Sequence, residues 1–193
     1  MKTMLKLSAA AALLVAAAPA FAAGTVLTVD FNKVFTDSNA AKSGTTQLHA
    51  KYDTLLQQRA SAFQTAAQAF QTLQNQLQAI KAPAKPTPAQ ESSLQAAYQR
   101  AGQAQEAAQQ LDQEVQAVGR YVQSQIVEHV TPIAEQVRAE RKADVVMSKN
   151  SLLASDPASD VTAVVIQRLD AAFPNPSITL PQQQAAPATG PGR

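Results

Sequence analysis

KAPAKPTPAQ, residues 81–90, separates two long helical patterns and decides the fold of this chain. Its prolines cannot continue a helix, because each lacks an N–H donor and restricts the residue before it. A new helix start follows directly. Thr87 can cap this helix, Pro88 occupies its first position, and Gln90 completes a capping box. We therefore expect the chain to turn at residues 81–88 and to return as a second helix.

Regular apolar spacing lies on both sides of this turn. From about residue 42 to residue 80, and again from Leu94 to Val137, apolar and aromatic residues recur at intervals of three and four. This spacing predicts one narrow apolar seam on each helix. Two such helices joined by a tight turn form an antiparallel coiled-coil hairpin, whose arms would reach roughly 60 to 80 Å. The molecule is therefore expected to be elongated and mainly α-helical.

Short β-strand patterns flank the predicted hairpin. The β-branched run at residues 25–29 predicts one strand, and residues 143–147 and 151–154 predict a second and a third. A short amphipathic helix is expected at residues 161–172. These segments comprise only about fifty residues, and a chain without cysteine cannot cross-link them. Because bodies this small usually need oligomerisation, we expect strands from neighbouring subunits to complete the sheet.

Both ends of the sequence differ from the middle. A basic start, an apolar run at residues 7–18 and an Ala-Phe-Ala sequence predict a signal peptide over residues 1–22. The apolar run is too short to span a bilayer, and no cysteine follows that could carry a lipid. We therefore expect a soluble protein of the periplasm. Residues 174–193 are rich in Pro, Gln and Ala, and this composition predicts a disordered tail.

Charge and composition exclude several function classes. Without residues 1–22, 14 Lys and Arg balance 14 Asp and Glu, so the chain lacks the basic excess typical of nucleic-acid binding. His49 and His129 lie far apart in the predicted hairpin, and we interpret both as surface residues rather than as a metal site. No nucleotide-binding or nucleophile motif occurs. We expect neither an enzyme nor a cofactor.

Several segments occur in an order that is typical of one known family. They are the strand with its continuation at residues 26–34, the Gln- and Ala-rich hairpin, and residues 131–133, 143–147 and 160–169. Together they resemble the Skp/OmpH family of periplasmic chaperones over nearly the whole chain after residue 22. The resemblance implies a homotrimer in which short strands form a β-body. Its three hairpins would surround a cavity for unfolded outer-membrane proteins, without ATP.

This resemblance implies a division of the chain into body and arm. Residues 23–42 and 138–173 would form the small α+β trimerisation body, and residues 43–137 the helical arm. The fold class is thus mainly α with a small β-body, in which a long hairpin projects from a sheet completed by trimerisation. Four valines are expected in the trimer body: Val26, Val29, Val145 and Val146.

The arm differs from strongly basic family members in its charge. Residues 45–140 carry seven Lys and Arg against eight Asp and Glu. Positive charge remains near the tip at Lys81, Lys85 and Arg100, where it could meet anionic lipid or lipopolysaccharide. A solvated helix end explains the same charges and is the interpretation that we favour.

Aromatic and acidic residues allow two interpretations each. Five aromatics at helical spacing could grip clients or form the hairpin core, and we favour the core; they are Tyr52, Phe63, Phe70, Tyr98 and Tyr121. Asp156 and Asp160 could suggest carboxylate catalysis, but a cap or turn beside Pro157 is the role that we favour.

Pro132 lies inside the apolar repeat of the second helix. It removes one backbone hydrogen bond to Glu128, so we expect a kink at the junction of arm and body. A static exit angle is the simpler interpretation of this kink. A hinge on which the arms splay is the functional one, and Gly44 would loosen the facing helix at the same level.

Two function classes remain for this architecture. The first is a holdase chaperone with unfolded outer-membrane proteins as partners, and the second is a coiled-coil spacer or adaptor of an envelope complex. Spacers are expected to show dense ion pairs for rigidity, whereas residues 43–140 contain 21 Gln and 19 Ala. This smooth and weakly charged surface favours adaptable contact, and hence the chaperone.

Overall fold

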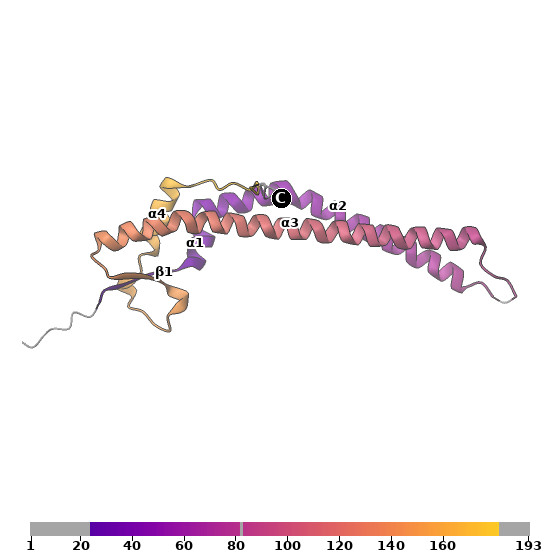
Figure 1. Ribbon diagram of the computed structural model, residues 1–193, viewed down its shortest axis with the longest axis horizontal. Helices are drawn as coiled ribbons and strands as arrows, with labels where there is room; N and C mark the ends of the chain where they lie inside the picture. Colours follow the sequence, from indigo (N-terminus) through magenta and orange to yellow (C-terminus); the bar gives the residue numbers. More distant parts are fainter. Residues whose placement is uncertain (1–23, 82, 182–193) are drawn as a thin grey trace, which may run out of the picture.

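The computed structural model describes residues 24–81 and 83–181 of the chain, and two long helices dominate it. Figure 1 shows these helices as a hairpin with a small body at one end and the connecting loop at the other. The predicted signal peptide and residues 182–193 lie outside the described residues. The elements are β1 (Val26–Val29), α1 (Phe31–Asp37), α2 (Asn39–Gln78), α3 (Pro88–Glu140), β2 (Val145–Ser148), the 3₁₀ turns η1 (Lys149–Ser151) and η2 (Pro157–Ser159), and α4 (Thr162–Ala172).

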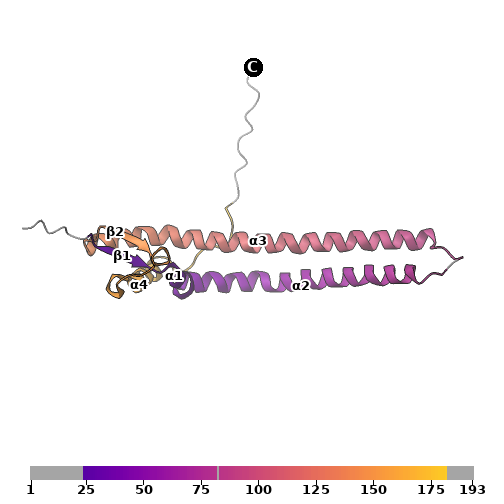
Figure 2. The same cartoon turned by 90° about the horizontal axis from the view of Figure 1, so that it is seen from below.

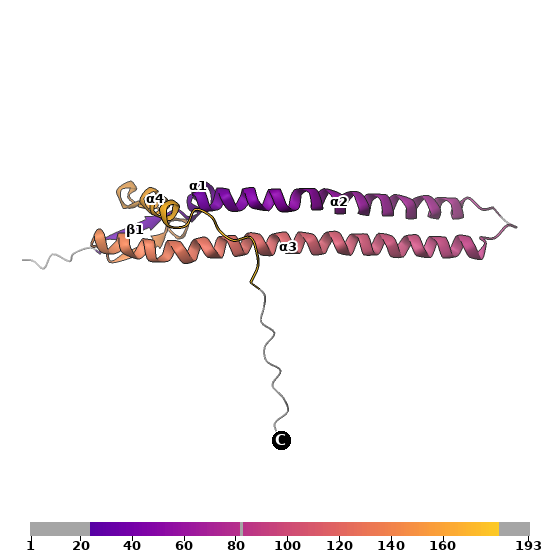
Figure 3. The same cartoon turned by 90° about the horizontal axis from the view of Figure 1, so that it is seen from above.

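The hairpin has the predicted turn and helix start. α2 contains 40 residues and α3 contains 53, which correspond to about 60 and 80 Å of helix. α3 begins with the predicted capping box, in which Thr87 accepts from the Gln90 amide and Gln90 accepts from the Thr87 amide. Figures 2 and 3 show the two helices side by side over most of their length. The expected mainly α-helical hairpin is confirmed.

The sheet of the body has two parallel strands that the whole hairpin separates in sequence. β1 pairs with β2 in the register Val26 opposite Val145 through Val29 opposite Ser148. On its other side, Thr28 of β1 forms an isolated bridge with Asp160, and the Thr28 carbonyl accepts from the Val161 amide at 2.9 Å. The predicted second strand is thus present with its start shifted to residue 145.

One local prediction for the body was wrong, and one helix of the body was not predicted. Residues 151–154 do not form a third strand, because Ser151 ends the turn η1 and residues 152–154 run as a loop with Leu153 fully exposed. The helix that was not predicted is α1, which follows Asp30. Asp30 caps this helix through the Lys33 amide, and Val34 is completely buried.

The main hydrophobic core lies where the body meets the end of α3. It combines β1, α1, the start of α2, the part of α3 from Val122 to Val137, and α4. An ion pair of Arg168 with Glu140, at 2.6 and 2.8 Å, joins α4 to α3. The fully buried members include Val29, Val34, Ile126, Val130, Val137, Val165 and Leu169. This core accounts for the stability of the body better than the two-stranded sheet could on its own.

Packing weakens along the arm toward the tip. A second cluster of Tyr52, Leu111 and Val118 holds the inner arm together. Farther out, among residues 53–81 and 83–110 of the described chain, Ala97 alone is buried. The outer arm is therefore a hairpin held mostly by helix propensity and half-buried contacts.

Residues 174–181, which we call the C-terminal segment, were predicted to be disordered, and that prediction was wrong. Figure 3 shows this segment, in yellow, crossing from α2 to α3 beside the body. Pro176 is buried, and Ile178 packs against both hydrophobic clusters. The contacts with the hairpin explain the order, because they supply the apolar burial that the segment lacks by itself.

Candidate client arm and assembly surface

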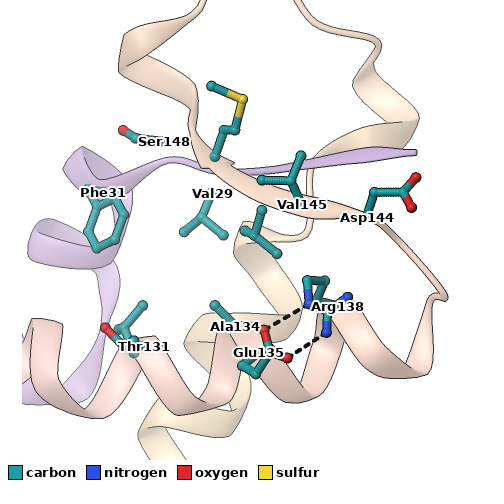
Figure 4. Close-up of a pocket in the computed structure, with 12 residues that line it drawn as sticks. Val29, Phe31, Thr131, Ala134, Glu135, Arg138, Asp144, Val145 and Ser148 are labelled. Carbon is teal, nitrogen blue, oxygen red and sulfur yellow. Dashed lines mark hydrogen bonds and ion pairs between the residues drawn. The ribbon is translucent and has the colours of Figure 1, made fainter. Parts of the chain in front are cut away.

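A pocket of about 550 Å³ lies between the sheet and the end of α3. Figure 4 shows side chains of β1 and β2 on one side of it and side chains of α3 on the other. Most of the surface that lines the pocket is apolar. The residues around it are Val29, Phe31, Val130, Thr131, Ala134, Glu135, Arg138, Asp144, Val145, Val146, Met147 and Ser148.

Charged groups lie at one end of this pocket and are paired within the chain. Arg138 donates to both carboxylate oxygens of Glu135 at 2.6 and 2.8 Å, and also to the Ala143 carbonyl. These hydrogen bonds lower the pKa of the Glu135 carboxyl. Asp144 accepts from the Thr25 amide at 2.7 Å and so fastens the start of the sheet. The charged end therefore serves to shape the pocket, and its apolar part remains open.

β2 has an open edge beside the same pocket. Within the described residues, β1 is the one strand that pairs with it. Unpaired edges of this kind are sites where another chain can add a strand. Val26, Val145 and Met147 are each 38 or 39% exposed, although they belong to the body.

The four valines predicted for the trimer body all lie in the sheet. Val29 is only 1% exposed and belongs to the core of this chain. Val146 is half-buried against that core. Val26 and Val145, which pair with each other in the register, are the two that remain available to a partner.

The three basic residues assigned to the tip are not brought together. Lys81 and Lys85 lie exposed in the connecting loop. Arg100 is twelve residues into α3, about 18 Å from its start, and borders a gap of about 350 Å³ between the helices. In the described part of the chain, none of the three forms an ion pair. Contact of the tip with anionic lipid or lipopolysaccharide stays a prediction. Of the three residues, Lys81 and Lys85 are the two that lie at the tip.

The aromatic residues of the arm have two different environments. Tyr52 is 2% exposed and its hydroxyl donates to Glu114 at 2.7 Å. Burial raises the pKa of this hydroxyl, which therefore remains a donor. Tyr98 is 66% exposed and tilts over Phe70, with 5.7 Å between ring centroids. The predicted core role is confirmed for Tyr52 and is wrong for Tyr98.

Neither histidine takes part in a metal site among the residues described. His49 bonds Asp53, one helical turn ahead, at 3.1 Å. His129 stacks on Phe173 with 3.9 Å between ring centroids. Asp156 caps η2 through the Ala158 amide, as its predicted role requires.

Pro132 lies inside α3, near its C-terminal end, and the helix continues on both sides of it. Its ring is exposed to solvent, and the Thr131 hydroxyl bonds the Val127 carbonyl at 2.9 Å one turn back. The hinge role therefore stays a prediction. Gly44, by contrast, does not loosen the facing helix, because it is buried where a Cβ atom would lie 2.7 Å from Val122.

Sequence reasoning missed the glutamines that hold the C-terminal segment. Gln125 of α3 and Gln47 of α2 bond the backbone of residues 176–177. Both lie near the body, at the inner end of the hairpin. Their spacing in sequence carries no signal, since 21 glutamines occupy residues 43–140.

The comparisons with known proteins agree with this architecture. A family model described as "Outer membrane protein (OmpH-like)" matches residues 25–169. This chain belongs to the OmpH-like family. The matched range contains the sheet, the whole hairpin and most of α4, and it ends before the C-terminal segment.

A solved structure of an OmpH-like protein has the same fold. It is a crystal structure from Caulobacter crescentus CB15, of a protein assigned as an outer membrane chaperone, with a TM-score of 0.59. At 18% identity, the alignment covers 91% of this chain and 95% of that one. No curated protein matches the sequence. None of the helices in residues 24–81 and 83–181 combines the length and hydrophobicity that a membrane span requires.

Proposed function

We propose that this chain is an ATP-independent holdase chaperone of the periplasm that binds unfolded outer-membrane proteins and prevents their aggregation. One observation carries the proposal: the arm is long, its surface is smooth and weakly charged, and its outer half contains almost no buried residues. Such a surface can follow clients of varied shape. Membership in the OmpH-like family supports a chaperone role in general.

The spacer alternative makes a different demand on the arm. A rigid spacer needs tight packing and ion pairs along its length. Between the two helices of the described outer arm, residues 53–81 and 83–110, no ion pair occurs, and a gap lined mainly by alanines separates them. These features favour a deformable arm, and therefore the chaperone.

The test of holding removes the outer arm. We expect deletion of residues 63–106, closed by a short turn, to abolish the suppression of aggregation of an unfolded outer-membrane barrel protein. The body and the cluster of Tyr52, Leu111 and Val118 lie outside the deletion, so the oligomer should persist. Full protection by the shortened protein would refute the proposed role of the arms.

We further propose that the protein works as a homotrimer assembled through its bodies. The open edge of β2 and the exposed Val26 and Val145 support this assembly. Val145→Asp should dissociate the trimer, because burying an unpaired carboxylate costs about 3 kcal/mol or more. Light scattering would detect this dissociation as a loss of molecular mass. Val127→Asp is the matched control, since Val127 is equally exposed on α3. A stable folded monomer of the unchanged chain at micromolar concentration would overturn the assembly.

A further inference from the structure

The C-terminal segment is held through its backbone. The side-chain amide of Gln125 donates to the Ser177 carbonyl at 2.8 Å and accepts from the Ser177 amide at 3.0 Å. A neighbouring β-strand would make the same pair of bonds. This pairing does not depend on the identity of the residue that is held.

α2 supplies the second half of the same site. Gln47 donates to the Pro176 carbonyl at 3.2 Å, and Ser43 donates to the Asn175 side chain at 2.8 Å. Gly44 lies beneath Pro176, where a Cβ atom would come within 3.2 Å of the proline ring. We call Ser43, Gly44, Gln47 and Gln125 the neck site.

Apolar contact in the neck site is small. Ile178 packs against the buried cluster of Tyr52, Leu111 and Val118 and also against the main core. Pro176 is buried, whereas Leu180 is 38% exposed and belongs to neither cluster. A ligand of the neck site therefore needs an extended backbone. It also needs a small or flat side chain, as at Pro176, and an aliphatic side chain two residues later, as at Ile178.

These contacts describe a ligand class. We propose that the neck site binds extended segments of unfolded polypeptide, and that the chain's own C-terminal segment occupies it until a client displaces it. The proposal rests on the proposed holdase function, to which it adds a defined point of contact. The occupant lies outside the matched range 25–169, whereas Ser43, Gly44, Gln47 and Gln125 lie inside it.

Tethering makes the C-terminal segment an effective competitor. A segment on a short linker has an effective concentration in the millimolar range, so a single weak contact suffices to keep it bound. A long unfolded client can still displace it, because the client also touches the arms. Release of the segment should therefore increase the affinity of the neck site for other extended chains.

The experiment uses full-length variants and a labelled octapeptide with the sequence of residues 174–181. Ile178→Asp should release the segment and tighten octapeptide binding roughly tenfold, which is about 1.4 kcal/mol, measured by fluorescence anisotropy. Leu180→Asp is the matched control and should bind as the unchanged chain does. Ser177→Pro, which removes the amide that Gln125 accepts from, is a second way to release the segment if the first variant folds poorly.

The site itself is tested in the released background. Adding Gln125→Ala to Ile178→Asp should remove the gain in octapeptide affinity. Retention of the full gain would overturn the proposal, and so would equal octapeptide binding by both release variants and the unchanged chain. In either case the segment would be a structural part of the fold.

Competition by a client separates this proposal from the proposed function. An unfolded outer-membrane barrel protein should displace the octapeptide from the Ile178→Asp variant. If the client is protected from aggregation but leaves the octapeptide bound, the neck site is not a client site and the holdase function stands. If no version of the protein protects the client while the octapeptide binds, the holdase function fails instead.

Discussion

Gly44→Ala should destabilise the protein, although alanine is the better helix former. A Cβ atom at position 44 would lie 2.7 Å from Val122 Cγ1 and 3.2 Å from Pro176 Cγ. Real Cβ atoms do not approach a neighbour as closely as the first distance, so α2 and α3 must separate or Val122 must leave its position. Val122 is only 6% exposed, and packed surroundings leave it little room to move.

Opposing effects set the magnitude of this change. Replacing glycine by alanine inside a helix stabilises it by about 1 kcal/mol. Overpacking of a closed site costs about 1–3 kcal/mol. Because Gly44 contacts both Val122 and Pro176, we expect the upper half of that range and a net loss of about 1–2 kcal/mol.

Two controls isolate the contact with Val122. Gly102→Ala and Gly119→Ala add a Cβ atom with nothing within 4 Å, so each should raise the free energy of unfolding by up to about 1 kcal/mol. Val122→Ala makes room for the new atom, and the double variant with Gly44→Ala should lose at least about 1 kcal/mol less than the two single losses together.

The assay is urea unfolding followed by far-ultraviolet circular dichroism. All variants are compared at one protein concentration, because assembly would make stability concentration-dependent. If Gly44→Ala were as stabilising as Gly102→Ala, the close contact would not exist in solution. Additivity of Gly44→Ala and Val122→Ala would contradict the assignment of the cost to this pair.

Three further predictions concern the body, the arm and their junction. Burial would raise the pKa of Asp160, but hydrogen bonds from Lys149 and Thr162 lower it to about 2. The contribution of Asp160 to the free energy of unfolding is therefore fully present above about pH 4 and is lost as the pH falls toward about 2. Asp160→Asn should weaken the dependence of the unfolding midpoint on pH in this acid range. It should also lower the free energy of unfolding by roughly 2 kcal/mol at neutral pH. Tyr52→Ala should cost about 3–5 kcal/mol in urea unfolding, whereas Tyr98→Ala should change stability by less than about 0.5 kcal/mol. Pro132→Ala should restore one helical hydrogen bond and narrow the distribution of distances between spin labels placed at the arm tips. An unchanged distribution would leave only a static exit angle.

Local chemistry was sufficient to predict the hairpin. The capping box at Thr87 and the apolar intervals in both helices are local signals, and the structure has both. α1 was also detectable, because Asp30 is a good cap and Phe31, Val34 and Phe35 follow at helical spacing.

Other features depend on tertiary contacts that no local pattern contains. The order of the C-terminal segment depends on Gln47 and Gln125, which are indistinguishable in sequence from the other arm glutamines. Residues 151–154 contain two leucines but no β-branched or aromatic residue, and no neighbouring strand is placed to pair with them in the described chain. The exposure of Tyr98 follows from the weak packing of the outer arm, which the regular seam did not reveal.

The pairing of β1 with β2 has a consequence for how the chain folds. β1 is made more than a hundred residues before its partner, since Val26 pairs with Val145. During that interval an apolar strand with both edges unpaired remains exposed, and such strands are prone to aggregate. Contacts between residues so distant in sequence also form slowly. A protein that we propose keeps other chains from aggregating therefore passes through the same hazard itself, until β2, at the start of the last quarter of its sequence, has been made.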